Sequence, residues 1–189
     1  MPDYRAQNFL RSATRLAARI DLMRSQSDSG IEILQVMPEI ANLINDVRNW
    51  QPRPCSATAP YMASEENFNA LWRQGLLCFI YHDVCLLPSQ DHRIQACVSS
   101  ALPAFQDLFW LQACLWPVLM IAVHVMTVEA RACFISVLRK MNSSLRFMLP
   151  LSLVAVLETI WHELDNDTTG QQRWKNVIRN SGLELIILL

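Results

Sequence analysis

Three side chains that can bind metals or attack electrophiles recur at helical spacing near the middle of the chain. Cys78, His82 and Cys85 stand at positions i, i+4 and i+7, which places them on one face of a helix. Such a face can hold a metal ion through thiolate and imidazole ligands, or activate a thiol beside an imidazole. Structural zinc sites, however, draw their ligands from two separated pairs, and the sequence has no C-x-x-C pair. We interpret this face first as part of a core with a hydrogen-bonded histidine, and keep a metal or thiol enzyme as the alternative.

Two other histidines have less defined surroundings. His124 lies inside a long apolar stretch, where it is either a core or interface histidine or the polar anchor of a ligand cavity. His162 stands near a predicted helix end, where a surface position suits it. The sequence contains no Gly-rich phosphate loop, no G-x-S-x-G elbow and no H-E-x-x-H. We therefore predict no catalytic residue, no metal site and no cofactor in this chain, which argues against an enzyme.

The apolar stretch around His124 dominates the sequence. Leu108 to Val128 (LFWLQACLWPVLMIAVHVMTV) carries no formal charge and is long enough to cross a bilayer. Gln112 and His124 would lack hydrogen-bond partners in lipid, and Pro117 removes a backbone donor in mid-segment. We therefore predict that residues 108–128 form the central helix of a protein core, with no membrane association. A membrane-anchored helical protein that spans at 108–128 is the alternative.

The remaining elements should also be helical. Apolar residues make up 52% of the chain, glycines number four, and the apolar positions repeat at intervals of three and four. We expect an all-α fold, with residues 1–189 forming one domain of about eight helices around the central apolar helix. The other expected helices cover residues 5–24, 31–37, 38–50 after a break at Pro38, 64–87 after a Ser64 cap, 89–105 with Ser89 as the cap, 129–141, 145–164 divided at Pro150, and 171–180.

Charge and cysteine content limit the cellular context. The net charge of −1 gives no general attraction to nucleic acid. Arg11, Arg15 and Arg19 share one helix face, which we interpret as a solvated face, with a phosphate-binding stripe as the alternative. Most of the six cysteines sit among apolar residues of predicted helices and there behave as small hydrophobes. An intracellular, reducing compartment without disulfides follows as the default.

A series of short motifs resembles a known family. The motifs, in order, are Trp72 to His82 (WRQGLLCFIYH), Asp91 to Leu102 (DHRIQACVSSAL), Leu115 to Ala122 (LWPVLMIA), Glu129 to Arg131 (EAR), Leu157 to Trp161 (LETIW), Trp174 to Val177 (WKNV) and Gly182 to Leu189 (GLELIILL). The series covers about two thirds of the chain and is similar to the regulatory, or middle-homology, domain of fungal-specific transcription factors of the zinc binuclear cluster family. This resemblance implies an all-helical domain that regulates transcription, in some members by sensing a small molecule, and usually as a nuclear homodimer.

The zinc binuclear cluster of that family has no counterpart in these residues. The cluster uses two C-x2-C-x6-C units, because two zinc ions share six thiolates. The cysteines at 55, 78, 85, 97, 114 and 133 do not fit that spacing. We therefore expect no direct nucleic acid contact from this chain.

The predicted function is transcriptional regulation in the nucleus. The domain would act by binding a partner subunit in a homodimer, a co-regulator protein or an apolar small-molecule effector. An apolar effector with one polar end would suit a cavity formed mainly by aromatic side chains, although the same side chains can equally fill the core. The candidate ligand-binding residues are Trp110, Trp116, Met120, His124, Phe147 and Trp161.

Overall fold

Helices form nearly all of the structure. The computed structural model describes residues 4–25, 30–52, 59–106, 114–145, 148–167 and 173–181, and within these ranges no residue is in a strand. The all-α prediction is confirmed. The helices are α1 (Tyr4–Ser25), α2 (Gly30–Arg48), α3 (Ala59–Phe79), the π-helical turn η1 (Ile80–Val84), α4 (His92–Gln106), α5 (Leu115–Ala122), α6 (Val128–Leu145), α7 (Leu149–Asp165) and α8 (Trp174–Ser181).

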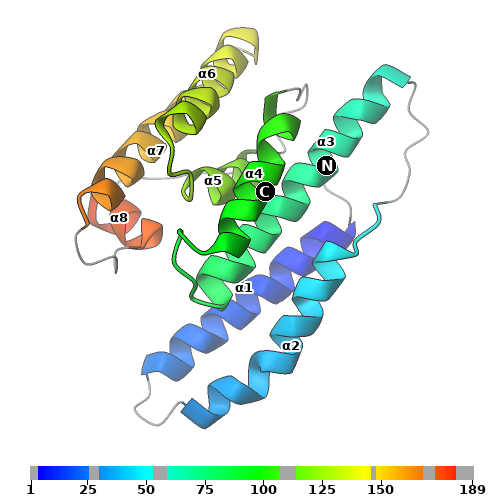
Figure 1. Ribbon diagram of the computed structural model, residues 1–189, viewed down its shortest axis with the longest axis vertical. Coiled ribbons are helices and arrows are strands. Elements are labelled where there is room, and N and C mark those ends of the chain that lie inside the picture. Colours follow the sequence, from blue (N-terminus) through cyan, green and yellow to red (C-terminus); the bar gives the residue numbers. More distant parts are fainter. Residues whose placement is uncertain are drawn as a thin grey trace.

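The first two helices form an antiparallel hairpin beside α3 (Figure 1). In α1 the apolar side chains of Ala13, Leu16, Ile20 and Met23 are buried, and Phe9 at the start of the same stripe is partly buried, because residues three and four apart lie on one face of a helix. The arginines predicted to be solvated, Arg11, Arg15 and Arg19, are exposed. Hydrophobic burial therefore attaches the hairpin, while its outer face stays charged.

Helix α3 is the element against which most of the others pack. It contacts α1, α2, α4 and α5, and η1 continues from its end. On α3, Gly75 allows the closest approach, since a Cβ built there would lie 2.6 Å from the Cα of Pro117 in α5. The absence of a side chain at Gly75 thus lets the backbones of α3 and α5 meet.

The continuous helix expected over residues 108–128 is wrong. Helix α5 is buried over most of its length, as predicted, but it ends at Ala122, and a turn at Val123 and His124 leads to a new helix at Val128. Two side chains donate hydrogen bonds to carbonyls that would have accepted backbone N–H groups in a longer helix. Gln95 Nε2 donates to His124 O at 2.9 Å, and Arg131 Nε donates to Val125 O at 3.0 Å. These tertiary hydrogen bonds satisfy the loop backbone and remove the need for helical continuation.

Prolines inside the helices do not end them, although proline usually breaks a helix because it lacks a backbone N–H. Helix α2 passes through Pro38 and α4 passes through Pro103, so the predicted break at Pro38 is wrong. Both prolines are exposed, which lets water satisfy the carbonyl that each leaves without a donor. Pro150 does not divide a helix but lies in the first turn of α7, where its missing N–H has no intrahelical partner to lose.

Two predicted helix ends are also displaced. Helix α3 begins at Ala59 rather than after Ser64, and α6 continues through Asn142 and Ser143. The Ser143 hydroxyl donates to the Lys140 carbonyl at 2.7 Å, a local bond that is compatible with a helix interior. Within the described ranges, no helix combines the length and apolarity that a membrane crossing requires.

Candidate functional site

The π-helical turn η1 falls within the face of Cys78, His82 and Cys85, which the sequence favours as part of the core and offers only as an alternative metal or thiol site. The Cys85 N–H donates to the Ile80 carbonyl, five residues back, at 2.8 Å. This wider turn breaks the i, i+4, i+7 alignment that an α-helix would produce. Cys78 is fully buried in contact with Cys97, and burial raises the pKa of its thiol well above the usual value. Across the described ranges, no three His, Cys, Asp or Glu side chains are grouped to hold a metal ion.

His82 instead meets His124, and the pair is deeply buried. Their ring centroids lie 4.7 Å apart at 60°, and the residues are 5% and 2% exposed. His82 Nδ1 donates to the Leu87 carbonyl at 2.9 Å, and His124 Nδ1 shares a 2.9 Å hydrogen bond with the Ser89 hydroxyl. Because a carbonyl only accepts, the proton of neutral His82 is on Nδ1, and Nε2 is a buried acceptor without a partner in the described structure.

Burial keeps both imidazoles neutral. It is the largest cause that lowers the pKa of His82, with nearby Arg173 and Lys175 lowering it further while Asp83 and the Leu87 hydrogen bond oppose the shift. The pKa of His124 is lowered further, by burial and by the proximity of His82. At neutral pH the two rings therefore act as polar anchors rather than as cations.

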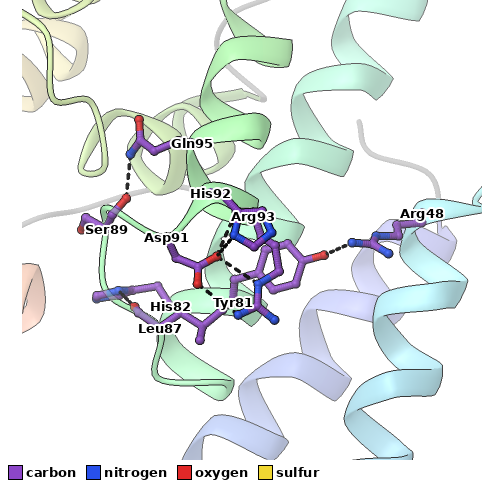
Figure 2. A network of polar contacts seen from close by, with 9 residues as sticks. All are labelled: Arg48, Tyr81, His82, Leu87, Ser89, Asp91, His92, Arg93 and Gln95. Carbon is purple, nitrogen blue, oxygen red and sulfur yellow. Dashed lines mark hydrogen bonds and ion pairs between the residues drawn. The ribbon is translucent and has the colours of Figure 1, made fainter.

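A polar network places these residues by fixing the segment before α4 (Figure 2). Asp91 accepts from Arg93 Nε at 2.9 Å and from Arg93 Nη2 at 3.0 Å, and the Arg93 hydrogen bonds hold the pKa of this carboxyl at about 2. Asp91 also accepts from the Arg93 backbone N–H, so Asp91 caps α4 and the prediction of Ser89 as the cap is wrong. The Ser89 side chain instead makes its hydrogen bond with His124, and Gln95 Nε2 donates to the backbone carbonyl of Ser89 at 2.6 Å.

The same network ties η1 to α2. Arg48 Nη2 donates to the Tyr81 hydroxyl at 2.6 Å. The guanidinium groups of Arg48 and Arg93 each lie 5.9 Å from the centre of the Tyr81 ring, within the range of a cation–π contact. Tyr81 is itself buried. Contacts from two sides therefore hold η1, and with it His82, in one position.

Helix α8 attaches to the other side of η1. Arg173 Nη2 donates to the His82 carbonyl at 2.9 Å. Lys175 Nζ lies 2.6 Å from Asp83 Oδ1, and the Asp83 side chain is only 2% exposed. These two bonds connect residues about ninety positions apart in the sequence, and they place the start of α8 beside the histidine pair.

A cavity of about 680 Å³ opens between these elements. Charged and hydrogen-bonding side chains form much of its wall, which suits a polar rather than an apolar molecule. The described residues that line it are Arg24, His82, Leu86, Leu87, Pro88, Ser89, Gln90, Val123, His124, Val125, Met126, Arg131, Leu164, Asp165, Asp167, Arg173 and Asn176.

The residues predicted to bind a ligand that the structure describes are not gathered around this cavity. Of the four that the structure describes, His124 lines it. Met120 and Trp161 are buried in the core, and the Trp161 indole donates to the Ala122 carbonyl at 2.8 Å. Trp116 stacks on Trp72 with a centroid distance of 5.5 Å. Trp110 and Phe147 lie outside the described residues. The apolar ligand cavity therefore stays a prediction.

Sequence reasoning missed most of the polar wall. Arg24 lies in the last turn of α1, Ser89 and Gln90 precede α4, Arg173 directly precedes α8, and Asn176 lies in the first turn of α8. No motif joins residues so far apart, so periodicity gave no signal for this set. The one available signal was that His82 and His124 interrupt otherwise apolar segments.

Comparison with known proteins decides the family. The model described as "Fungal specific transcription factor domain" matches residues 5–188, which is nearly the whole chain.

This chain belongs to the fungal-specific transcription factor domain family. The resemblance proposed from the sequence motifs is therefore confirmed. No curated protein and no solved structure matches the chain significantly. For this fungal transcription factor domain, membership supports a role in transcription regulation, in a family of regulators rather than of enzymes.

Proposed function

We propose that this fungal transcription factor domain regulates transcription in the nucleus by non-covalent binding. The observation that carries the proposal is the family match over residues 5–188. The helical fold supports it, since His82 and His124 are buried with lowered pKa values and Cys78 has a raised pKa. Such groups hold structure together more readily than they catalyse reactions.

The proposed protein partner is a second copy of the chain or a co-regulator. Large apolar side chains stand exposed on the α1–α2 hairpin, where Leu22 is 61% and Leu34 is 68% exposed. Exposed apolar groups beside charged ones are a common composition of protein interfaces. A homodimer would have twice the mass of the 21.7 kDa chain, and sedimentation equilibrium of the purified protein measures this directly. A strictly monomeric protein would leave the co-regulator as the partner.

The function is tested by tethering the chain to a promoter. Residues 1–189 are fused to a heterologous DNA-binding domain that has no activity of its own, and transcription of a reporter with the matching site is measured. We expect the fusion to change reporter output several-fold in either direction relative to the DNA-binding domain alone. An unchanged output from a stable, nuclear fusion protein would contradict the proposal.

The proposal also includes an effector. The sequence suggested an apolar effector, and that suggestion applies to the surroundings of Trp116, Met120 and Trp161. The 680 Å³ cavity next to His124 has a different chemical character, and its ligand is considered separately below.

A further inference from the structure

The cavity beside the histidine pair carries an excess of positive charge. Its described wall contains three guanidinium groups and two carboxylates. Arg131 and Asp165 neutralise each other in a two-point ion pair, with Arg131 Nη2 at 2.8 Å from Asp165 Oδ1. This pair is already satisfied, which leaves two cations, Arg24 and Arg173, beside one further carboxylate, Asp167, on the described wall. The remaining charge is therefore net positive, and the two arginines are the groups that can meet an anionic ligand.

These two arginines approach the cavity from different elements. Arg24 lies in the last turn of α1, is exposed, and makes no hydrogen bond or ion pair within the described residues. Arg173 Nη2 donates a hydrogen bond to the His82 carbonyl. The guanidinium has further N–H groups that can donate to a ligand. The wall on which Arg173 lies also includes Asn176 in the first turn of α8, and the dipole at this end of a helix favours an anion.

Neutral hydrogen-bonding groups occupy the rest of this wall. Gln90 and Asn176 are exposed amides on the wall of the cavity, and each offers both donors and an acceptor. His82 contributes an unpartnered Nε2 acceptor that is buried at the cavity wall. A buried acceptor without a partner costs free energy, so a ligand hydroxyl that reached it would be stabilising.

We propose that this cavity binds a small hydroxylated carboxylate, with the carboxylate on Arg24 and Arg173 and the hydroxyl groups on Gln90, Asn176 and His82 Nε2. This inference rests on the proposed regulatory function and names the class of effector that would control it. A volume of about 680 Å³ lies within the usual range for small-molecule sites. An apolar molecule in the same place would cover guanidinium groups without pairing them, which is unfavourable.

Binding would join elements that are distant in the sequence. A carboxylate held by Arg24 and Arg173 would connect the end of α1 to the start of α8. Any ligand that binds only the folded arrangement stabilises it in proportion to its concentration and affinity. The ligand would therefore increase the population of molecules with α8 attached to η1, and this population shift is how the effector would change partner binding.

The test uses the purified chain of residues 1–189 and isothermal titration calorimetry with four probes. Gluconate carries both a carboxylate and hydroxyl groups, hexanoate lacks the hydroxyls, glucose lacks the charge, and glucose 6-phosphate replaces the carboxylate with a phosphate. We expect gluconate to bind more tightly than the other three. Absence of binding at about 10 mM gluconate, well above the Kd of a weak site at about 1 mM, would overturn the proposal. Equal or tighter binding of any other probe would overturn the assigned ligand class.

Variants then place the ligand in the cavity. Arg24→Gln should weaken gluconate binding about tenfold, because a charge-assisted hydrogen bond is lost. Arg15→Gln is the matched control, since it removes an exposed arginine from the same helix outside the described wall, and it should bind as the unmodified chain does. Equal affinities for the two variants would contradict the site. Arg173→Gln should also weaken gluconate binding, and its affinity is compared once circular dichroism has shown that the variant is folded.

The outcomes also separate this inference from the proposed function. If the tethered chain changes reporter transcription but gluconate does not bind, regulation stands and the ligand assignment fails. If gluconate binds through Arg24 but the tethered chain leaves transcription unchanged, the site stands and the regulatory proposal fails.

Discussion

Gly75 shows how strongly one missing side chain determines the packing of α3 against α5. A Cβ at this position would lie 2.6 Å from both the Cα and the Cβ of Pro117. Alanine favours a helix over glycine by about 1 kcal/mol, whereas overpacking a core costs about 1–3 kcal/mol and sometimes more. The clash involves backbone that cannot rotate away, so we expect Gly75→Ala to lower the free energy of unfolding. Urea denaturation of Gly75→Ala and of its neighbour Gln74→Ala checks this, and a Gly75→Ala variant as stable as the unmodified chain would contradict it.

A second residue-scale prediction concerns the buried indole of Trp161. Its Nε1 donates to the Ala122 carbonyl at the end of α5, which also accepts from the Val125 N–H at 3.1 Å. Trp161→Phe would therefore remove one of two hydrogen bonds to this carbonyl, at a cost of about 0.5–1.5 kcal/mol. Trp50 is the matched control, because it is similarly buried but its Nε1 has no partner within the described structure. Thermal denaturation should show a larger loss for Trp161→Phe than for Trp50→Phe. Equal losses would mean that the hydrogen bond contributes nothing beyond side-chain volume.

At the scale of the element, α8 depends on its ion pair with η1. Lys175→Met would leave the buried Asp83 carboxylate without its partner, which is destabilising, while partial exposure of Lys175 limits the effect to about 1–3 kcal/mol. Lys175→Met should therefore speed hydrogen exchange of the α8 amides, and adding Asp83→Asn should restore part of the protection.

The exposed pair between Arg139 and Glu158 provides the control for this prediction. Its atoms are 3.7 Å apart and both side chains are at least half exposed, so Arg139→Met should change stability by less than about 1 kcal/mol. If Lys175→Met behaves like Arg139→Met, α8 is held mainly by apolar contacts instead.

For the whole molecule, the buried histidine pair predicts loss of stability in mild acid. The pKa values of His82 and His124 are lowered in the folded protein, so the unfolded chain binds more protons as the pH falls below about 6.5. Each neutral imidazole then removes up to about 1.4 kcal/mol per pH unit. The pKa values of Asp91 and Asp165 are also lowered, but those carboxyl groups affect stability only below their ordinary range, at more acidic pH.

Urea midpoints measured between pH 8 and pH 5 test the prediction. Stability should be level above about pH 7 and fall below about pH 6.5. His124→Gln should reduce the steepness of that fall, because one fewer imidazole titrates. His92→Gln is the control, since His92 is exposed, and its profile should keep the original slope. A flat profile for the unmodified chain would exclude the pair as the cause.

The sequence by itself determined the features that depend on neighbours along the chain. Burial of Ala13, Leu16, Ile20 and Met23 follows from spacing alone, as do the helical class and the ordered motifs that predicted the family. Helix ends were less predictable, because α2 passes through Pro38 and solvent satisfies the carbonyl that the proline leaves free. Local propensity does not include that compensation.

Only the tertiary structure decided the site. His82 and His124 each drew notice as polar residues in apolar surroundings, but their contact depends on the π-helical turn after α3 and on the turn after α5. The cavity adds Arg24 from α1 and Arg173 from the start of α8, residues that no sequence period connects. Their arrangement follows from long-range hydrogen bonds and ion pairs, such as Arg173 to the His82 carbonyl. Such bonds form only after hydrophobic burial has brought distant helices together.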